Sequence, residues 1–201
     1  THWVQGDAKV SAELLLEELE RRGVEKTGFR TPELAAEIAG YSRATEFVDE
    51  STDDQLDPRT TMLEIDPHLP RERTIITDCG IFHGWPSKYM TVPDPGGFLF
   101  TDGFGAVGLG LGYSIGAYVG RSERRPVLVI GDGGLMMSVQ EFETAVRHRI
   151  PLIVLVMNDE AYGAEATVLK RDGHPPNLAY FDNPTFEEIA RAMGGEGYTV
   201  R

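Results

Sequence analysis

Short apolar runs, each followed by glycine or polar residues, recur through the second half of the chain. Residues 127–130 and 151–157 are the longest of these runs, and residues 74–77 and 98–100 are shorter examples. Runs of this length, bounded by turn residues, are typical of strands buried on both faces of a parallel sheet. The pattern predicts strands at these four places and another at residues 198–200, where the chain stops.

Between and before these runs, apolar residues recur at intervals of three and four, which is the spacing of a helix face. Capping residues and glycines mark the boundaries. The predicted helices cover residues 8–22, 32–40, 58–66, 106–119, 138–150 and 185–193. Alternating strands and helices predict an α/β fold: a doubly wound, mostly parallel sheet flanked by helices, behind an N-terminal helical and linker extension.

Composition and charge exclude several classes of partner. The 19 basic and 32 acidic side chains give a formal net charge of -13, which would repel a nucleic-acid backbone. No apolar run approaches the roughly 20 residues that span a bilayer, and the single cysteine, Cys79, forms no intrachain disulfide. We therefore expect a cytoplasmic protein without nucleic-acid or membrane partners. The chain begins without a methionine or an apolar leader, which favours a fragment or a trimmed chain.

Acidic residues and glycines stand where the two longest strands are expected to end. Gly131-Asp132-Gly133-Gly134 follows residues 127–130, and Asn158-Asp159 follows residues 151–157. Parallel sheets bind ligands at the carboxyl ends of their strands, so these segments are expected to converge. Mg²⁺ commonly takes one or two carboxylates together with phosphate and water oxygens, and glycines let backbone amides approach a diphosphate. The two segments predict a metal and diphosphate site.

The spacing of these segments resembles that in thiamine-diphosphate-dependent enzymes of the acetolactate synthase, pyruvate oxidase and benzoylformate decarboxylase superfamily. In that family a Gly-Asp-Gly segment precedes an Asn-Asn pair, here with twenty-four residues between them. Segments 77–85 and 103–108 resemble the same cofactor domain. The resemblance implies thiamine diphosphate and Mg²⁺ as cofactors. The residues it places at the cofactor are Gly105, Ala106, Val107, Gly131, Asp132, Gly133, Gly134, Asp159, Ala161, Tyr162 and Gly163.

The resemblance also implies roles for several residues. Asp132 matches the metal-binding aspartate, Asp159 stands where the family usually has a metal-binding asparagine, and Ala161 would offer its carbonyl oxygen to the metal. The Gly105 carbonyl would accept a hydrogen bond from the pyrimidine amino group. Val107 would bend the cofactor, although such a valine is ordinarily a core residue. A second carboxylate at Asp159 would bring the metal site close to neutrality before the diphosphate arrives.

Two residues are candidates for proton transfer. His83 follows the predicted strand 74–77, and Glu165 lies where some decarboxylases of this family place an acid. A loop histidine more often faces solvent, and a glutamate more often lies on the surface, so both roles compete with an ordinary alternative. Cys79 has no cationic neighbour in the sequence and is interpreted as a packing residue.

The resemblance implies an organisation and an activity. Residues 1–23 would be the strand and helix that end a preceding middle domain, residues 24–56 a linker, and residues 57–201 the cofactor domain, truncated at its carboxyl end. The enzyme would be a lyase or transferase that cleaves or forms C–C bonds beside the carbonyl of a 2-oxo acid. Its activating glutamate lies on a companion domain, so this chain alone would be inactive. The parent would be a homodimer or homotetramer.

A second interpretation stays open. Residues 103–108 read Gly-Phe-Gly-Ala-Val-Gly, a G-x-G-x-x-G segment after a short predicted strand, which also occurs in dinucleotide-binding folds. Asp132 would then bind a ribose. A ribose-binding acid simply ends a strand and needs no flanking glycines, so this interpretation leaves the glycines around Asp132 unexplained. The alternative is a non-catalytic or dinucleotide-binding Rossmann-like module. Preference for NAD over thiamine diphosphate would distinguish it.

Overall fold

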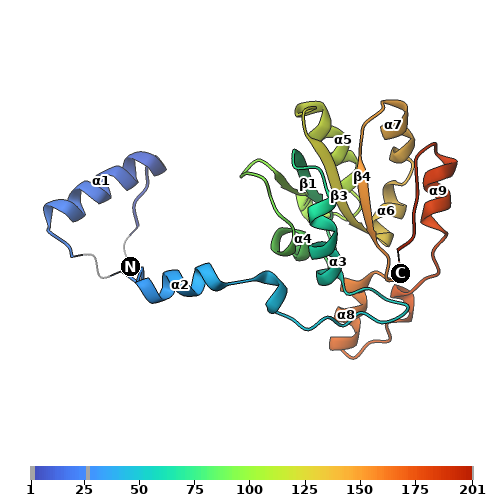
Figure 1. Cartoon of the computed structure of the whole chain (residues 1–201), viewed down its shortest axis with the longest axis horizontal. Coiled ribbons are helices and arrows are strands. Elements are labelled where there is room, and N and C mark those ends of the chain that lie inside the picture. The colour runs from blue at the N-terminus through green and yellow to red at the C-terminus, as the bar shows by residue number, and fades with distance from the viewer. Residues whose placement is uncertain (1–2, 26–27, 201) are drawn as a thin grey trace. The chain divides into compact units, whose positions relative to one another are not determined.

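The computed structural model describes residues 3–25 and 28–200. The chain divides into two compact units, residues 1–42 and residues 43–201. The first holds two helices, α1 (Ala8–Arg21) and α2 (Pro32–Gly40), which match the sequence prediction (Figure 1). The strand predicted ahead of α1 is not formed by residues 3–7, because no strand lies within the described part of this unit to pair with it; residues 1 and 2 lie outside the described residues.

The second unit is built on a parallel sheet with the strand order β2-β1-β3-β4. Its strands are β1 (Arg73–Thr77), β2 (Phe98–Phe100), β3 (Arg125–Gly131) and β4 (Ile153–Met157). All three pairings are parallel, so the carboxyl ends of the strands share one edge of the sheet. The strands predicted from the four apolar runs are confirmed.

Helices cover both faces of this sheet (Figure 1). Neighbouring residues of a strand point to opposite faces: Val127 packs in a core with Met62, whereas Leu128 packs in a second core with Leu111. This arrangement confirms the predicted doubly wound α/β fold. No helix among the described residues has the length and apolar content to cross a membrane. The helices of this unit are α3 (Pro58–Ile65), α4 (Gly84–Tyr89), α5 (Gly110–Gly120), α6 (Asp132–Ser138), α7 (Glu141–Arg147), α8 (Gly163–Arg171) and α9 (Phe186–Ala192).

Residues 43–56, predicted as part of a linker, contact the sheet unit. Arg43 Nη1 donates to the carbonyl oxygens of Lys88 and Met90, at 3.1 and 3.0 Å. The Phe47 ring meets the Tyr89 ring edge-on, with 5.4 Å between centroids. These residues therefore pack with the sheet, while the domain limits inferred from the sequence stay a prediction.

The helix predicted at residues 106–119 begins later, at Gly110. Phe104, Gly105 and Gly108 have φ angles of 62°, 64° and 86°. The left-handed value at Gly108 does not occur inside a right-handed helix, so residues 106–109 form a loop that follows a short turn at residues 103–105. Residues 103–108 are therefore available as a loop above the carboxyl edge of the sheet.

The next predicted helix begins earlier than Ser138. α6 starts at Asp132 with Gly131 as its N-cap, and a break at residues 139–140 separates it from α7. The Ser138 hydroxyl is buried and has no hydrogen-bond partner among the described residues, so it caps no helix. The glycines around Asp132 therefore lie within the first turn of a helix rather than ahead of one.

The strand predicted at residues 198–200 is not formed. Tyr198 and Val200 are 79% and 76% exposed, and this segment pairs with no strand in the described part of the chain. An apolar pair without a neighbouring edge to bond gains nothing from strand geometry. The helix before it, α9, is confirmed within residues 185–193.

Oppositely charged side chains pair at the amino-terminal edge of the sheet. Arg73, at the start of β1 and 4% exposed, pairs with Asp66 and donates to the Thr91 carbonyl oxygen at 2.7 Å. Arg124, just before β3 and 8% exposed, pairs with Asp94. The hydrogen bond from Arg124 lowers the pKa of Asp94, so this carboxylate stays charged.

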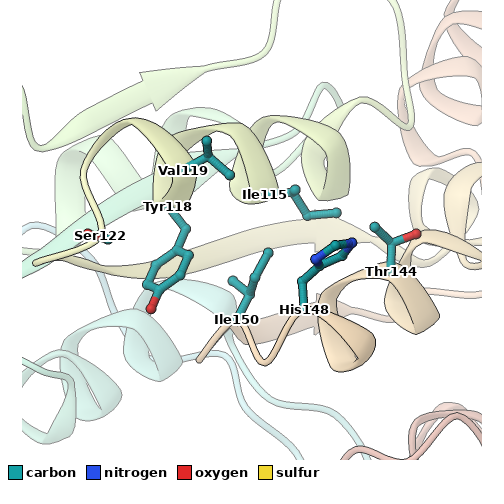
Figure 2. A pocket seen from close by; sticks show the side chains of 7 residues that line it. All are labelled: Ile115, Tyr118, Val119, Ser122, Thr144, His148 and Ile150. Carbon is teal, nitrogen blue, oxygen red and sulfur yellow. The ribbon is translucent and has the colours of Figure 1, made fainter.

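A hollow of about 330 Å³ lies between α5 and α7. Figure 2 shows Ile115 and Tyr118 of α5 on one side of it, with His148 and Ile150 on the other. Ser122 and Ile150, which precede β3 and β4, place the hollow toward the amino ends of these strands. It contains none of the site residues predicted from the sequence.

Candidate functional site

The two strand-end segments lie side by side at the carboxyl edge of the sheet. β3 and β4 are parallel neighbours, and Gly131 is the partner of Met157 in their register. Asp132 and Asn158 are the next residues, so they leave the sheet at the same level. The structure therefore brings together the two segments that the sequence predicts to converge.

Asp132 is held in a defined orientation. The residue is only 1% exposed and occupies the first position of α6. Its Oδ1 accepts the N–H of Gly133 at 2.8 Å, and its Oδ2 accepts Nδ2 of Asn183 at 2.6 Å. A carboxylate has about four acceptor positions, so both oxygens keep capacity for a cation.

Asn183 was not predicted from the sequence. Its Nδ2 also donates to Oδ1 of Asn158 at 2.7 Å, so one side-chain amide bridges the ends of β3 and β4. The residue is half-buried and lies 51 positions after Asp132. The only local signal is an Asn-Pro pair ahead of α9, which is typical of a turn and carries no information about its distant partners.

A short antiparallel contact fastens the segment that follows Asn158. Ala161 and Tyr180 form an isolated bridge, flanked by backbone hydrogen bonds of 2.8 and 3.0 Å between residues 160–162 and 179–181. Glu160 takes a φ of 54°, a left-handed conformation that is uncommon for a residue other than glycine. Neither flanking bond uses the carbonyl oxygen of Ala161, which remains available as a ligand.

Asp159 lies close to Asp132. The residue as a whole is exposed, but loss of water around its carboxyl first, and then the negative charge of Asp132, raise the pKa of the Asp159 carboxyl above its ordinary value. The fold without a cation therefore disfavours the charged form of Asp159. A divalent cation beside both carboxylates would reverse this effect, because a bound cation is the largest local charge in such a site.

Close approaches around this pair require glycine at two positions. A Cβ on Gly133 would lie 2.5 Å from Cε1 of Tyr162, and a Cβ on Gly163 would lie 2.6 Å from Oδ2 of Asp159. Both distances are too short for a real contact. The Tyr162 ring thus closes on the first turn of α6, and the structure gathers these predicted cofactor residues in one place.

Asp78, which follows β1, holds a second part of the site. It is fully buried and accepts the Thr101 hydroxyl at 2.9 Å and the N–H of Gly108 at 2.8 Å. A Cβ on Gly134 would lie 2.6 Å from Oδ2 of Asp78. Asp78 therefore fixes the loop after β2 against the start of α6. The sequence predicts no role for Asp78 beyond its place in a family-like segment.

The loop held by Asp78 carries the residues predicted to face the pyrimidine. Gly105 ends a short 3₁₀ turn, η3 (Gly103–Gly105), and nothing lies within 4 Å of its Cβ position. Ala106 and Val107 are half-buried, and Val107 Cγ1 lies 3.3 Å from the Cβ position of Gly134. Val107 therefore lies next to α6. Gly105 has a left-handed conformation and open space at its Cβ position.

The two candidates for proton transfer are exposed residues. His83 Nδ1 lies 2.6 Å from the Gly80 carbonyl oxygen, and the ring stacks on Phe100 with 5.2 Å between centroids. A carbonyl only accepts, so Nδ1 carries the hydrogen and Nε2 of the neutral ring is an acceptor. Glu165 lies in the first turn of α8. Burial first, and then nearby acids including Glu165, raise the pKa of the Cys79 thiol, which suits an unreactive cysteine.

Comparison with known proteins decides the family. The model of the family "Thiamine pyrophosphate enzyme, C-terminal TPP binding domain" matches residues 78–201. The chain belongs to this family. The matched range begins at Asp78, just after β1, and contains the carboxyl ends of β2, β3 and β4 together with Asp132 and Asp159.

Several relatives share this domain within longer chains. The chain is 32% identical over 155 residues to 2-hydroxyacyl-CoA lyase 2 of Danio rerio, covering 76% of this chain and 24% of the relative. It is 32% identical to sulfoacetaldehyde acetyltransferase of Alcaligenes xylosoxydans xylosoxydans (72% and 24%) and 31% identical to a putative acetolactate synthase large subunit of Mycobacterium tuberculosis (73% and 27%). The chain thus spans about a quarter of these relatives' length.

A solved structure shares the fold of this thiamine pyrophosphate domain. The thiamine diphosphate-dependent 4-hydroxybenzoylformate decarboxylase of Rhodococcus jostii RHA1 matches with a TM-score of 0.65 at 22% identity. The match covers 74% of this chain and 28% of that protein. At this identity the likeness supports the fold, and the family rests on the sequence match.

The residues present fit the metal-bound diphosphate of thiamine pyrophosphate. Asp132, Asp159 and the Ala161 carbonyl offer three oxygen ligands, and Mg²⁺ commonly completes its shell with phosphate and water. Among the described residues, no three His, Cys, Asp or Glu side chains cluster to hold a metal by themselves. This donor set therefore suits a hard cation that takes part of its ligands from a phosphate group.

Proposed function

We propose that the carboxyl edge of this sheet binds thiamine diphosphate through Mg²⁺. Asp132, Asp159 and the carbonyl oxygen of Ala161 would coordinate the metal, and the backbone of residues 131–134 would contact the diphosphate. The observation that carries this proposal is the bridging of Asp132 and Asn158 by one amide at neighbouring strand ends. The raised pKa of Asp159 supports it, because two adjacent carboxylates call for a cation.

The loop held by Asp78 would position the rest of the cofactor. The Gly105 carbonyl would accept a hydrogen bond from the pyrimidine amino group, and Val107 would support the bent conformation, with Ala106 between them. Tyr162 and Gly163 would line the other side. The contact between Val107 and the start of α6 supports this assignment, because it brings the loop within reach of the diphosphate site.

The activity we infer is cleavage or formation of a C–C bond beside the carbonyl of a 2-oxo acid. When bound, thiamine diphosphate supplies the electron sink for such chemistry, and the protein controls position and proton transfer. His83 and Glu165 would exchange protons with the substrate. The defined tautomer of His83 supports its role, since Nε2 is prepared to accept a proton.

A companion domain would complete the enzyme. The matched part of this chain corresponds to about a quarter of the relatives' length, and the family resemblance places the activating glutamate on a separate domain. We therefore expect the parent protein to act as a homodimer or homotetramer and this chain to be inactive alone. Residues 1–23 would be the end of a preceding domain, and residues 24–56 the linker.

Calorimetric titration of the full chain with thiamine diphosphate, with and without Mg²⁺, tests the cofactor proposal. Binding is expected only when Mg²⁺ is present, and Asp132→Ala should abolish it, because this variant removes a buried metal ligand. Asp172→Ala is the matched control, since Asp172 lies after α8 and pairs only with the neighbouring Arg171 among the contacts of described residues.

The same titration with NAD separates the dinucleotide alternative. Saturable binding of NAD that is independent of Mg²⁺, without binding of thiamine diphosphate, would favour a Rossmann-like module and contradict the proposal. Binding of thiamine diphosphate that survives Asp132→Ala would contradict the assignment of the metal site while leaving the family unaffected.

A further inference from the structure

One side-chain amide joins the two halves of the candidate metal site. Nδ2 of Asn183 lies 2.6 Å from Oδ2 of Asp132 and 2.7 Å from Oδ1 of Asn158. A charged carboxylate only accepts hydrogen bonds, so the amide must present its NH₂ group to Asp132. Both amide hydrogens are then used, one toward the end of β3 and one toward the end of β4.

The chain around Asn183 is itself anchored on the metal loop. Residues 179–181 pair with residues 160–162 through the bridge between Ala161 and Tyr180. The segment that ends in Asn183 thus holds the backbone of Ala161 through the bridge at Tyr180. It also holds Asn158, the residue just before Asp159, through the side chain of Asn183. The ligand positions and the group that orients them therefore all belong to this chain.

Hydrogen bonds to a ligating carboxylate set its orientation and add to metal affinity. In Asp132 one such bond comes from the backbone of Gly133 and the other from Asn183. Removal of Asn183 leaves the Asp132 carboxylate held by the Gly133 N–H alone and unlinks it from the Asn158 loop. The effect would fall on the cation first, because Asn183 lies outside the sheet and takes part in none of its strand pairings.

The second carboxylate changes what the site can bind without the cofactor. With Asp132 and Asp159 both charged, a divalent cation meets two negative charges before any phosphate arrives. A site with one carboxylate and one amide would instead rely on the diphosphate for most of its negative charge.

We propose that Asn183 is a positioning residue for the metal site, and that it holds Asp132 and the Asp159 loop so that this chain binds a divalent cation before the diphosphate. This inference rests on the proposed function, since the same residues would coordinate Mg²⁺. It concerns groups of this chain only, and so it holds without a companion domain.

Mn²⁺ binding to the full chain tests the inference, with free Mn²⁺ followed by its electron paramagnetic resonance signal in the absence of any diphosphate. Wild-type chain is expected to bind Mn²⁺, and Asn183→Ala to bind it about 10- to 100-fold more weakly, the usual effect of removing a group that orients a metal ligand. Asn177→Ala is the matched control: Asn177 is an exposed asparagine in the preceding turn, η4 (Asn177–Ala179), and should bind like wild type.

Thermal unfolding without metal separates positioning from folding. Asn183→Ala should unfold close to the wild-type temperature and lose most of the increase that Mn²⁺ produces in wild type. If Asn183→Ala does not fold, Asn183→Ser replaces it, because the shorter hydroxyl cannot reach both acceptors. Unchanged Mn²⁺ affinity in the folded variant overturns the positioning role.

Two further outcomes are distinguishable. Binding of Mn²⁺ by wild type only after thiamine diphosphate is added would overturn binding of the metal first and leave the proposed function intact. Absence of Mn²⁺ binding both with and without thiamine diphosphate would contradict the proposed function itself. Asp159→Asn should weaken Mn²⁺ binding more without the diphosphate than with it; an equal loss would count against the inference.

Discussion

The two edges of the sheet differ in how their charged side chains are arranged. At the amino edge, Arg73 meets Asp66 and Arg124 meets Asp94, so each buried charge has a partner of opposite sign. At the carboxyl edge, Asp132 and Asp159 are neighbours of like charge, and the Asp159 carboxyl has a raised pKa as a result of burial and of Asp132. Opposite charges compensate each other at the amino edge, whereas in the proposed function a cation would compensate the like charges at the carboxyl edge.

This difference separates stability from binding within one fold. Breaking a buried pair of opposite charges leaves an uncompensated charge and destabilises the protein. Removing one of two like charges relieves their repulsion, and in the proposed site it removes one ligand of the metal. Substitutions at the amino edge should therefore change unfolding, and those at the carboxyl edge should change binding first.

The largest expected effect is at the amino edge. Arg73→Met removes the buried partner of Asp66 and a donor to the Thr91 carbonyl oxygen, and should lower the free energy of unfolding by about 3 kcal/mol. Urea unfolding measures this loss. Mn²⁺ affinity of the protein that remains folded should not change; a loss of affinity equal to that of Asp132→Ala would show that the two edges are not independent.

At the carboxyl edge, Gly134→Ala should act through crowding. Its Cβ would lie 2.6 Å from the buried Oδ2 of Asp78, so the substitution should cost about 1–3 kcal/mol and displace the loop that Asp78 holds through Gly108. Calorimetry should show weakened binding of thiamine diphosphate together with lower stability in urea.

Gly112→Ala is the matched control for this crowding. Gly112 lies within α5 with open space at its Cβ position, so alanine should raise stability there by about 0.5–1 kcal/mol. If both substitutions destabilise equally, the cost at Gly134 does not come from Asp78.

A substitution at Asp159 is expected to raise the stability of the metal-free protein, by less than the substitutions above lower it. A carboxyl whose pKa is raised in the fold favours folding while protonated, and this contribution is lost as the pH rises through the raised pKa. Charged Asp159 therefore weakens the metal-free fold at neutral pH. Asp159→Asn should raise the unfolding temperature at pH 7 in the presence of a chelator by about 1–2 °C, a shift typical of exposed sites.

The pH dependence provides the check on that result. The difference between Asp159→Asn and wild type should shrink as the pH is lowered toward the ordinary aspartate pKa of about 3.9. A difference that stays constant from neutral to acid pH would show that the charge of Asp159 is not its source.

The smallest expected effect returns to the amino edge. Arg121 and Glu123 form an exposed pair at 3.5 Å, with side chains 43% and 66% exposed. Glu123→Ala should change the free energy of unfolding by no more than about 0.5 kcal/mol, because water screens such pairs. A loss comparable to that of Arg73→Met would mean that burial does not set the difference between these pairs.

Local sequence patterns predict most of the sheet unit. The apolar runs at 127–130 and 151–157 locate β3 and β4, because both faces of the sheet are covered and strand positions on either face then favour apolar side chains; β3 is buried and β4, last in the strand order, is half-buried. The spacing of Asp132 from Asn158 predicts their convergence, since neighbouring parallel strands end at one edge. Helix starts were less predictable: left-handed residues such as Gly108 delay α5, and the α6 cap is a glycine rather than Ser138.

The roles of Asn183 and Asp78 could not be predicted from the sequence, because both depend on contacts with residues far along the chain. Asn183 meets Asp132 across 51 residues, and Asp78 meets Gly108 across 30 residues, so neither contact leaves a periodic or local pattern. Both residues act by holding other residues in place. Only the tertiary structure shows which distant groups their hydrogen bonds reach.

Asn183 lies far along the chain from the residues that it contacts, so the candidate site is completed late in synthesis. A chain grows from its amino end, and the four strands of the sheet are complete by residue 157. The proposed metal ligands have all been made by residue 161, yet the segment that pairs with them spans residues 179–183. During synthesis the sheet can therefore form before Asp132 is joined to the neighbouring strand end, because the segment that carries Asn183 is translated after all four strands.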